Sequence, residues 1–270
     1  MKKLDILLLS TFLGTALSSS AAVATFTDSF TTGYTDDSSP AGINGWLLTA
    51  LPATDPEADM TTTDVNGDGY LSIVPATQNF QKIYKSASDS FEIGQTITIS
   101  TTFSFGNANA ASFDANAWSI GFSGGAGGGI NLGFNLGSSA NALGATPTPS
   151  GDGTGTQWNM SLINGASTVN YFGTRDTNSH TASMSITKTA TTNEFVVALF
   201  FDGNAVGNTS TITNSALYND STVFFTGSAG GGGVNAVGGV AVDSMSVVPE
   251  PSSVALLGLG ALGLFARRRR

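Results

Sequence analysis

Residues 96–105 read Thr-Ile-Thr-Ile-Ser-Thr-Thr-Phe-Ser-Phe, and this stretch decides the fold class. Ile97, Ile99, Phe103 and Phe105 share one parity, whereas Thr or Ser occupies every position of the other parity. Successive side chains of a β-strand point to opposite faces of the sheet. This period of two therefore predicts a strand with one face in a core and the other in water.

The same alternation recurs outward along the chain. It appears in residues 118–122, 130–136 and 183–187. Residues 195–201 are apolar at both parities, which predicts a central strand covered on both faces. That run ends at Asp202-Gly203, a turn signal that leads into a further strand.

No segment of residues 25–248 shows a sustained helical period with caps, and Gly, Asn, Asp and Ser cluster between the alternating runs. Many short alternating strands separated by turn signals are typical of a sandwich or barrel. The sequence therefore predicts an all-β fold, a sandwich or a barrel in one domain over residues 25–248. Residues 141–155, with Pro147 and Pro149, are expected to form a long exposed loop.

The layout resembles the concanavalin-like (LamG-like) jelly-roll domains. The segments that carry the resemblance are residues 97–105, 118–122, 195–203 and 242–247. The resemblance implies the sandwich but no activity, because one fold hosts many functions.

Charge and cysteine content exclude several function classes. Without Lys2, Lys3, Asp5 and the four C-terminal arginines, the chain has four basic and eighteen acidic residues, a formal charge of −14. Nucleic-acid binding needs a basic surface, so no nucleic-acid partner is expected. The chain has no cysteine, which excludes disulfides, thiolate metal sites and a cysteine nucleophile.

The N-terminus has the three parts of a secretory signal peptide. Met1-Lys2-Lys3 is positive, residues 6–17 are apolar, and Ala22-Val23-Ala24 gives an Ala-x-Ala ending. We expect residues 1–24 to be a signal-peptide helix that signal peptidase cleaves after Ala24. An uncleaved N-terminal anchor is the alternative.

The C-terminus reads Pro249-Glu250-Pro251, an apolar run over residues 254–266, and then Arg267, Arg268, Arg269 and Arg270. Thirteen residues make a helix of about 20 Å, short of the ~30 Å hydrocarbon core. The four arginines hold their end in the cytoplasm, and a short span is tolerated by local bilayer thinning. We expect a short transmembrane helix that serves as a transient anchor in the inner membrane.

Residues 249–270 resemble the PEP-CTERM sorting signal, whose three parts are a Pro-Glu-Pro motif, an apolar span and an arginine cluster. Pro249, Glu250 and Pro251 match the motif residue by residue. The resemblance implies an exosortase substrate of a Gram-negative bacterium that makes extracellular polysaccharide. The implied destination is the cell surface or the extracellular space. A plain C-terminal anchor is the alternative.

Asp64, Asn66 and Asp68 occupy the first, third and fifth positions of a pattern similar to a Ca²⁺-binding loop, with Gly69 at the sixth. Pro75 stands at the twelfth position, where such a loop has its bidentate Glu. The segment therefore predicts either a weak Ca²⁺ site or an Asp-Gly turn from which residues 71–74 leave as a strand. No other cofactor is implied.

The sequence favours no enzyme. It has no alternating Glu-x-Asp-x-Glu pair of the kind that glycoside hydrolysis needs. His180 is the one histidine, no Gly-x-Ser-x-Gly elbow accompanies it, and we expect it in a solvated loop. The glycine-rich residues 124–129 lack the Lys-Ser/Thr of a phosphate loop and are expected to form a flexible loop.

Trp46 and Trp158 lie in turn-rich surroundings and are the candidates for platforms that stack on sugar rings, with ordinary packing as the alternative. Three functions follow, in decreasing order of support. The first is a non-enzymatic surface or matrix protein associated with exopolysaccharide. The second is a carbohydrate-binding module with a defined sugar site, with Ca²⁺ assisting. The third is a glycoside hydrolase.

Overall fold

The computed structural model describes thirteen stretches of the chain. They are residues 26–31, 42–51, 60–65, 68–73, 80–88, 91–105, 118–125, 129–138, 158–163, 169–174, 176–219, 223–229 and 240–249.

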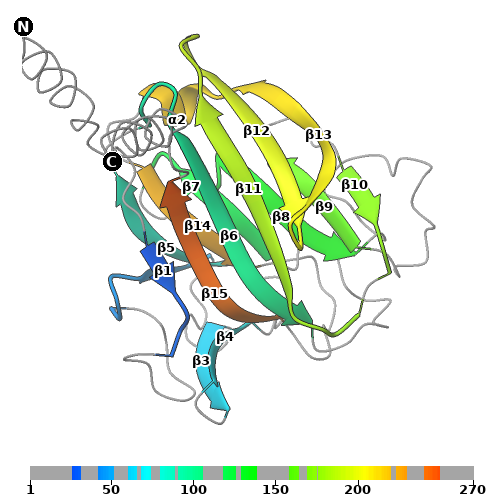
Figure 1. The fold of residues 1–270 in the computed structure, drawn as a ribbon. Coiled ribbons are helices and arrows are strands. Elements are labelled where there is room, and N and C mark those ends of the chain that lie inside the picture. Colours follow the sequence, from blue (N-terminus) through cyan, green and yellow to red (C-terminus); the bar gives the residue numbers. More distant parts are fainter. Residues whose placement is uncertain are drawn as a thin grey trace, which may run out of the picture.

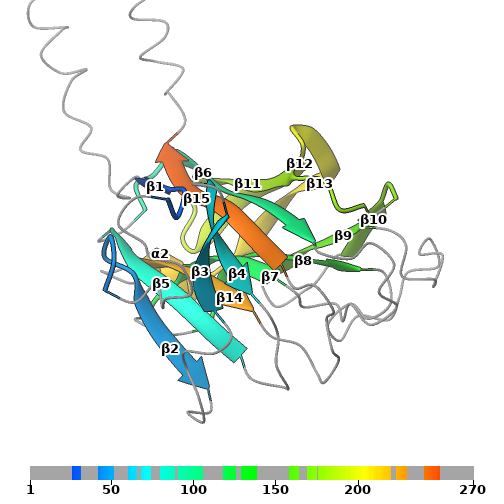
Figure 2. The same ribbon diagram turned by 90° about the horizontal axis from the view of Figure 1, so that it is seen from below.

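Within these residues the strands form two antiparallel sheets that lie face to face (Figures 1 and 2). The eight-stranded sheet has β1 beside β15 and otherwise runs in the order β13 (Asn204–Thr213), β12 (Glu194–Phe201), β11 (His180–Lys188), β6 (Thr96–Phe105), β15 (Val240–Pro249), β4 (Asp68–Ile73), β3 (Met60–Val65), with β1 at Phe26–Asp28.

The seven-stranded sheet lies behind it in Figure 1. Its order is β10 (Val169–Phe172), β9 (Trp158–Ile163), β8 (Leu132–Ser138), β7 (Trp118–Ser123), β14 (Val223–Ala229), β5 (Phe80–Ser88), β2 (Leu47–Leu51). One short helix, α2 (Ser215–Asn219), is the single helix of the described residues. The predicted all-β sandwich is confirmed.

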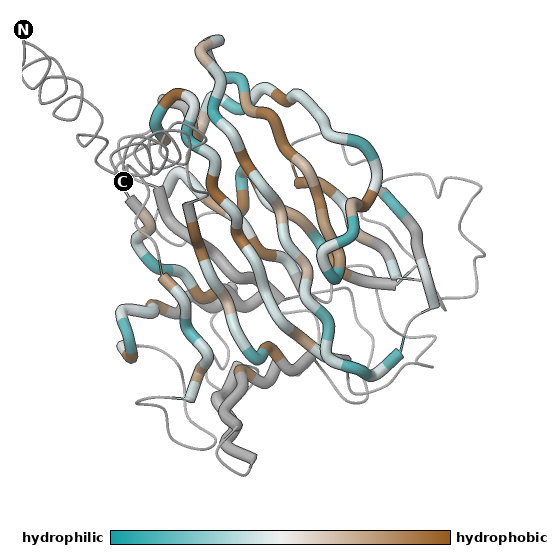
Figure 3. The backbone as a smooth tube through the Cα atoms, viewed as in Figure 1, coloured by the Kyte–Doolittle hydropathy of each residue, from teal (hydrophilic) through white to brown (hydrophobic). Residues whose placement is uncertain are grey.

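The core fills the space between the two sheets, as the alternation of residues 96–105 predicts. In β6, Ile97, Ile99, Thr101 and Phe103 are buried, whereas Thr98, Ser100 and Thr102 on the other parity are partly exposed. The alternation is visible as a change of hydropathy along the strands in Figure 3. Phe91 joins the sheets, because its ring packs edge-on against Phe122 of β7 and Phe195 of β12 at 5.2 and 5.4 Å.

The prediction for residues 195–201 is partly wrong. β12 is an interior strand, paired with β11 and β13, but only one of its faces lies in the core. Phe195, Val197, Leu199 and Phe201 are buried, and the residues between them are partly exposed. The second apolar parity therefore belongs to the outer face of the sheet and not to a second covering layer.

The turn predicted at Asp202-Gly203 is confirmed. Both residues have positive φ angles, 48° and 76°, and they connect β12 to β13. This backbone twist is that of a two-residue type I′ hairpin turn, which favours Asp-Gly.

The N-terminal strand is fixed by a buried carboxylate. Asp28 is 6 % exposed and accepts hydrogen bonds from the Trp46 indole Nε1 at 2.8 Å and from the Phe30 amide at 2.9 Å. Trp46 itself packs against Phe26 and Phe30. A buried polar group is costly unless it is hydrogen-bonded, so these contacts define where the chain enters the sheet.

We expect Asp28→Ala to lower the free energy of unfolding by about 2–3 kcal/mol, because it leaves the buried indole N–H and amide N–H without this acceptor. Urea denaturation measures the change. Thr27→Ala, in the same strand but exposed, is the matched control and should stay within about 0.5 kcal/mol of the wild type. Equal losses in the two variants would contradict the role of Asp28.

Candidate functional site

Most of the predicted processing residues lie outside the described part of the chain. These are Ala22 and Ala24 at the predicted signal cleavage site, Glu250 and Pro251 of the sorting motif, and Arg267 to Arg270. Pro249 is the exception, because it is the last residue of β15. In the described residues no helix is long and apolar enough to cross a membrane. The predicted anchor, residues 254–266, lies outside them.

The two ends of the sandwich domain lie side by side. β1 pairs antiparallel with β15, and Phe26 stands opposite Val247. Pro249 stands opposite Ile97 of β6. The chain therefore enters the sheet at Phe26 and leaves it at Pro249 from the same end, and the Pro-Glu-Pro motif begins inside the sheet without an intervening linker.

Of the two alternatives for Trp46 and Trp158, the structure favours ordinary packing over sugar-stacking platforms. Trp46 is 0 % exposed and Trp158 is 2 % exposed. The Trp158 indole packs against Phe103 and Phe201 in the core. Stacking on a sugar needs an accessible ring face, and the faces of both indoles are covered by the packing around them.

The segment with Asp64 and Asp68 forms a hairpin. Val65 of β3 pairs with Asp68 of β4, and Asp64 pairs with Gly69. Asn66 lies outside the described residues. β4 begins at Asp68, so the connection falls at residues 66–67 and not at the predicted Asp68-Gly69. The register favours the turn over a helix-flanked Ca²⁺ loop, and Ca²⁺ binding stays a prediction.

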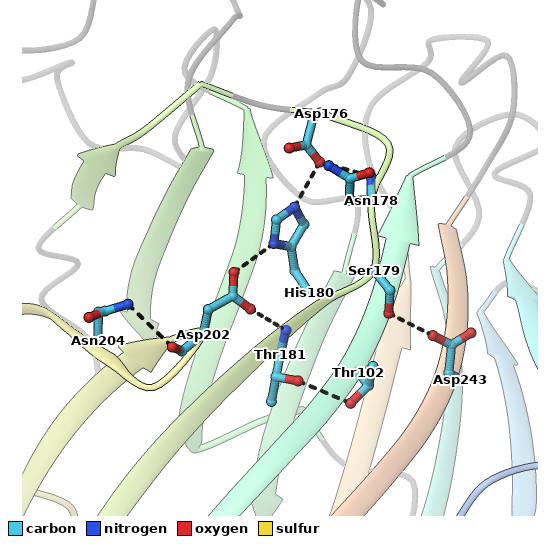
Figure 4. A network of polar contacts seen from close by, with 9 residues as sticks. All are labelled: Thr102, Asp176, Asn178, Ser179, His180, Thr181, Asp202, Asn204 and Asp243. Atoms are coloured by element: carbon cyan, nitrogen blue, oxygen red, sulfur yellow. Dashed lines mark hydrogen bonds and ion pairs between the residues drawn. The ribbon is translucent and has the colours of Figure 1, made fainter.

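His180 lies at the start of β11, not in the solvated loop that the sequence predicts. Its side chain is 13 % exposed, and its two ring nitrogens contact two carboxylates (Figure 4). Nε2 lies 2.8 Å from Asp176 Oδ1, and Nδ1 lies 2.7 Å from Asp202 Oδ2. His180 thus links the segment before β11 to the turn after β12.

Aromatic rings surround the imidazole on its inner side. Trp158 and Phe201 lie 5.1 and 4.9 Å from it, measured between ring centroids. Burial among these rings lowers the pKa of His180, but the hydrogen bonds to Asp202 and Asp176 outweigh it, so the pKa is raised. The hydrogen bond to His180 in turn lowers the pKa of Asp176. These shifts favour an imidazolium held between two carboxylates.

This arrangement is a structural clamp and lacks the parts of a hydrolytic triad. A triad needs a nucleophile hydrogen-bonded to the imidazole, and the nearby Ser179 hydroxyl donates instead to Asp243 at 3.1 Å. In the part of the chain that the structure describes, no serine bonds to His180, and no group of three His, Asp or Glu side chains is placed to hold a metal ion.

A cleft opens between the two sheets at the β10 and β13 edges. Its volume is about 240 Å³. Its lining combines an apolar floor with amide and hydroxyl groups, from Leu162, Asn170, Val197, Leu199, Gly207, Asn208 and Ser210. The register shifts between Val197 and Leu199 in the β12–β13 pair, and bulges of this kind are frequent beside binding sites.

Gly207 suits this cleft because a larger residue would be strained at its positive φ and would displace the Asn170 side chain. Its φ is 71°, and a Cβ there would lie 2.5 Å from Oδ1 of Asn170. The sequence analysis missed these residues, since Asn170 and Gly207 come together only when β10 and β13 meet across the sandwich. The feature that points to the bulge is Gly207 itself, a glycine inside the strand β13.

Residues 247–270 match the family model of the PEP-CTERM protein-sorting motif. The chain carries a PEP-CTERM sorting signal. The sequence-based identification of this signal is thereby confirmed, and the signal implies export, cell-surface sorting and processing by exosortase. No curated protein matches the chain.

Solved structures share the sandwich. The carbohydrate recognition domain of Emp46p in its potassium-bound form is similar with a TM-score of 0.50 and 13 % identity, over 84 % of this chain and 96 % of that chain. For lectin I-B4 from Griffonia simplicifolia the values are 0.49 and 10 %, over 84 % and 100 %. A protein of unknown function from Shewanella oneidensis MR-1 gives 0.47 and 11 %, over 90 % and 94 %. The likeness is one of fold, and the predicted concanavalin-like sandwich is confirmed.

The His180 clamp predicts a pH-dependent stability. A raised pKa of His180 stabilises the fold below its ordinary pKa of 6.5, and this contribution is lost as the pH rises through the raised value. A lowered pKa of Asp176 stabilises the fold above its ordinary 3.8 and is lost as the pH falls through the lowered value. The clamp is therefore strongest between these limits, at a pH of roughly 5.

We expect His180→Phe, which keeps a ring among the aromatic neighbours, to melt below the wild type at a pH of about 5 and to approach it at a pH of about 8. Thermal melting followed by circular dichroism at several pH values measures the difference. A gap that stays constant with pH would show that His180 acts by packing alone.

Proposed function

We propose that this is a non-enzymatic protein of the cell surface or extracellular matrix, exported from a Gram-negative bacterium. Signal peptidase removes residues 1–24, exosortase cleaves at Pro249-Glu250-Pro251, and the sandwich then associates with exopolysaccharide. The observation that carries the proposal is the match of residues 247–270 to the sorting motif.

The arrangement of the chain ends supports this route. Because β1 and β15 are neighbours, the points at which the signal peptide and the C-terminal segment join the sandwich lie at one end of it. Both membrane-directed segments can then lie in the same bilayer while the folded domain stands beside it. Cleavage at the sorting motif releases the sandwich without cutting into its core strands.

The mature protein should begin at Thr25 and lack Arg267 to Arg270 in a host that has exosortase. Intact-mass measurement of the surface protein tests both ends. In a strain without exosortase, the arginine tail should remain and the protein should stay in the membrane fraction. Surface protein that still contains the tail in the competent host would contradict the proposal.

A defined sugar site is the second candidate function, and the cleft at β10 and β13 favours it. Its lining is uncharged and offers amide and hydroxyl groups above an apolar floor. Neutral sugars have hydroxyls that accept and donate hydrogen bonds and C–H faces that pack on apolar surface. The solved neighbour with a TM-score of 0.50 is itself a carbohydrate recognition domain. Ca²⁺ held by Asp64, Asn66 and Asp68 is a further part of this proposal.

Asn170→Ala and Asn208→Ala should each weaken glycan binding about 5–10-fold, since each loses a hydrogen bond of roughly 1–1.5 kcal/mol. A glycan array identifies the ligand, and titration calorimetry measures the affinity. Thr209→Ala is the matched control, because Thr209 is exposed in the same bulge but does not line the cleft. Unchanged affinity in both Asn variants would exclude the cleft, and release of sugar from the ligand would overturn the non-enzymatic assignment.

A further inference from the structure

The outer face of the eight-stranded sheet carries hydroxyl side chains on three neighbouring strands, β15, β6 and β11. We call this set the hydroxyl face. It consists of Thr96, Thr98, Ser100, Thr102 and Ser104 of β6, Thr181, Ser183, Ser185 and Thr187 of β11, and Ser244 and Ser246 of β15.

The strand register aligns these residues in rows. Ser100 stands opposite Ser246 on one side and Ser183 on the other. Thr102 stands in the same way between Ser244 and Thr181. Neighbouring strands lie about 4.8 Å apart, and every second residue of a strand is about 7 Å from the last. The hydroxyl groups therefore form a two-dimensional array with a regular spacing.

Hydrogen bonds between strands hold several of these side chains in place. Ser100 bonds to Ser246 at 2.7 Å, and Thr96 bonds to Thr187 at 2.7 Å. Two hydroxyls that share one hydrogen bond use only one of their two protons, so each pair keeps an O–H donor and several lone pairs for a ligand. Side chains that are already ordered lose less entropy on binding.

The hydroxyl face carries no charge, although the whole chain has a net charge of −9. Acidic residues border the face at its ends: Asp202 and Asp243 bond to Thr181 and Ser179 at one end, and Glu194 bonds to Thr189 at the other. Figure 1 looks directly onto this side of the sheet, and no other element of the described chain crosses it. A polyanion is repelled by such a protein, whereas a neutral partner meets neither repulsion nor the cost of desolvating a charge.

The chemistry of the face decides among neutral partners. Protein interfaces are enriched in aromatic residues, Met and Arg; the hydroxyl face has none, although the partly exposed Phe200 of β12 borders it opposite Ser183. Sugar hydroxyls, in contrast, donate and accept like Ser and Thr. We propose that the hydroxyl face binds an extended, neutral polysaccharide through many weak, repeated hydrogen bonds. The proposal rests on the matrix role proposed above, but it does not depend on the β10–β13 cleft.

Co-sedimentation with insoluble neutral polysaccharides tests this, using cellulose, curdlan and insoluble mannan as probes and alginate beads as the anionic comparison. We expect the protein purified from its exporting host to bind at least one neutral probe. Ser183→Glu, which puts a charge at the centre of the face, should weaken that binding at least tenfold. Thr192→Glu, with the same charge in the exposed β11–β12 turn, should bind like the wild type.

Ser183→Ala is a second variant that tests the face if Ser183→Glu does not fold. It should weaken polysaccharide binding measurably without changing the melting temperature. Equal binding by the wild type and a folded Ser183→Glu would overturn the hydroxyl face and leave the matrix role intact. Binding of no polysaccharide by the wild type would overturn both. Preference for alginate, or a Ser183-dependent dimer in light scattering, would assign the face to an anionic polymer or to a second copy of the chain.

Discussion

The alternation of β6 between core and solvent is the constraint on which the rest of the structure depends. Ile97, Ile99 and Phe103 fix one face of this strand in the core, and a shift of one residue would turn every one of them outward. β6 pairs with both β11 and β15, so the position of β6 determines the register of the strands on either side. The same alternation that builds the core therefore also places a hydroxyl group at each outward position of β6.

The termini show how topology serves processing. β15 is the last strand of the described chain, yet it lies in the interior of the sheet between β6, β4 and β1. Removing it would expose the edge of β6 and would take the buried Val242, Met245 and Val247 out of the core. The sorting motif begins at the last residue of this strand, so cleavage there leaves the sheet complete. Folding and sorting thus share the end of β15, because the residues that match the sorting motif begin at the buried Val247.

Local sequence reasoning went wrong where a side chain is used by residues far away in the chain. His180 and Trp158 both lie among turn-forming residues. His180 was expected in a solvated loop, and Trp158 was a candidate for a sugar platform, with ordinary packing as the alternative. In the fold, Trp158 packs against Phe103 and Phe201, and His180 lies over these rings with Asp176 and Asp202 on its nitrogens. Trp46 is likewise buried, and its indole N–H donates a hydrogen bond to Asp28, which lies in another strand. An aromatic or titratable residue in a polar stretch of sequence can therefore be buried, because its partners can come from other strands.

The sequence by itself determined the fold class, the strand at residues 96–105, the Asp202-Gly203 turn and the sorting signal. Each of these depends on a local pattern: a period of two, a positive-φ dipeptide, or a run of residues read by a processing enzyme. Only the tertiary structure decided the cleft, the His180 clamp, the rows of the hydroxyl face and the meeting of the two chain ends. Each of those depends on which strands become neighbours, and strand pairing between residues as distant as Ser100 and Ser246 is set by the packing of the whole core and by no local signal.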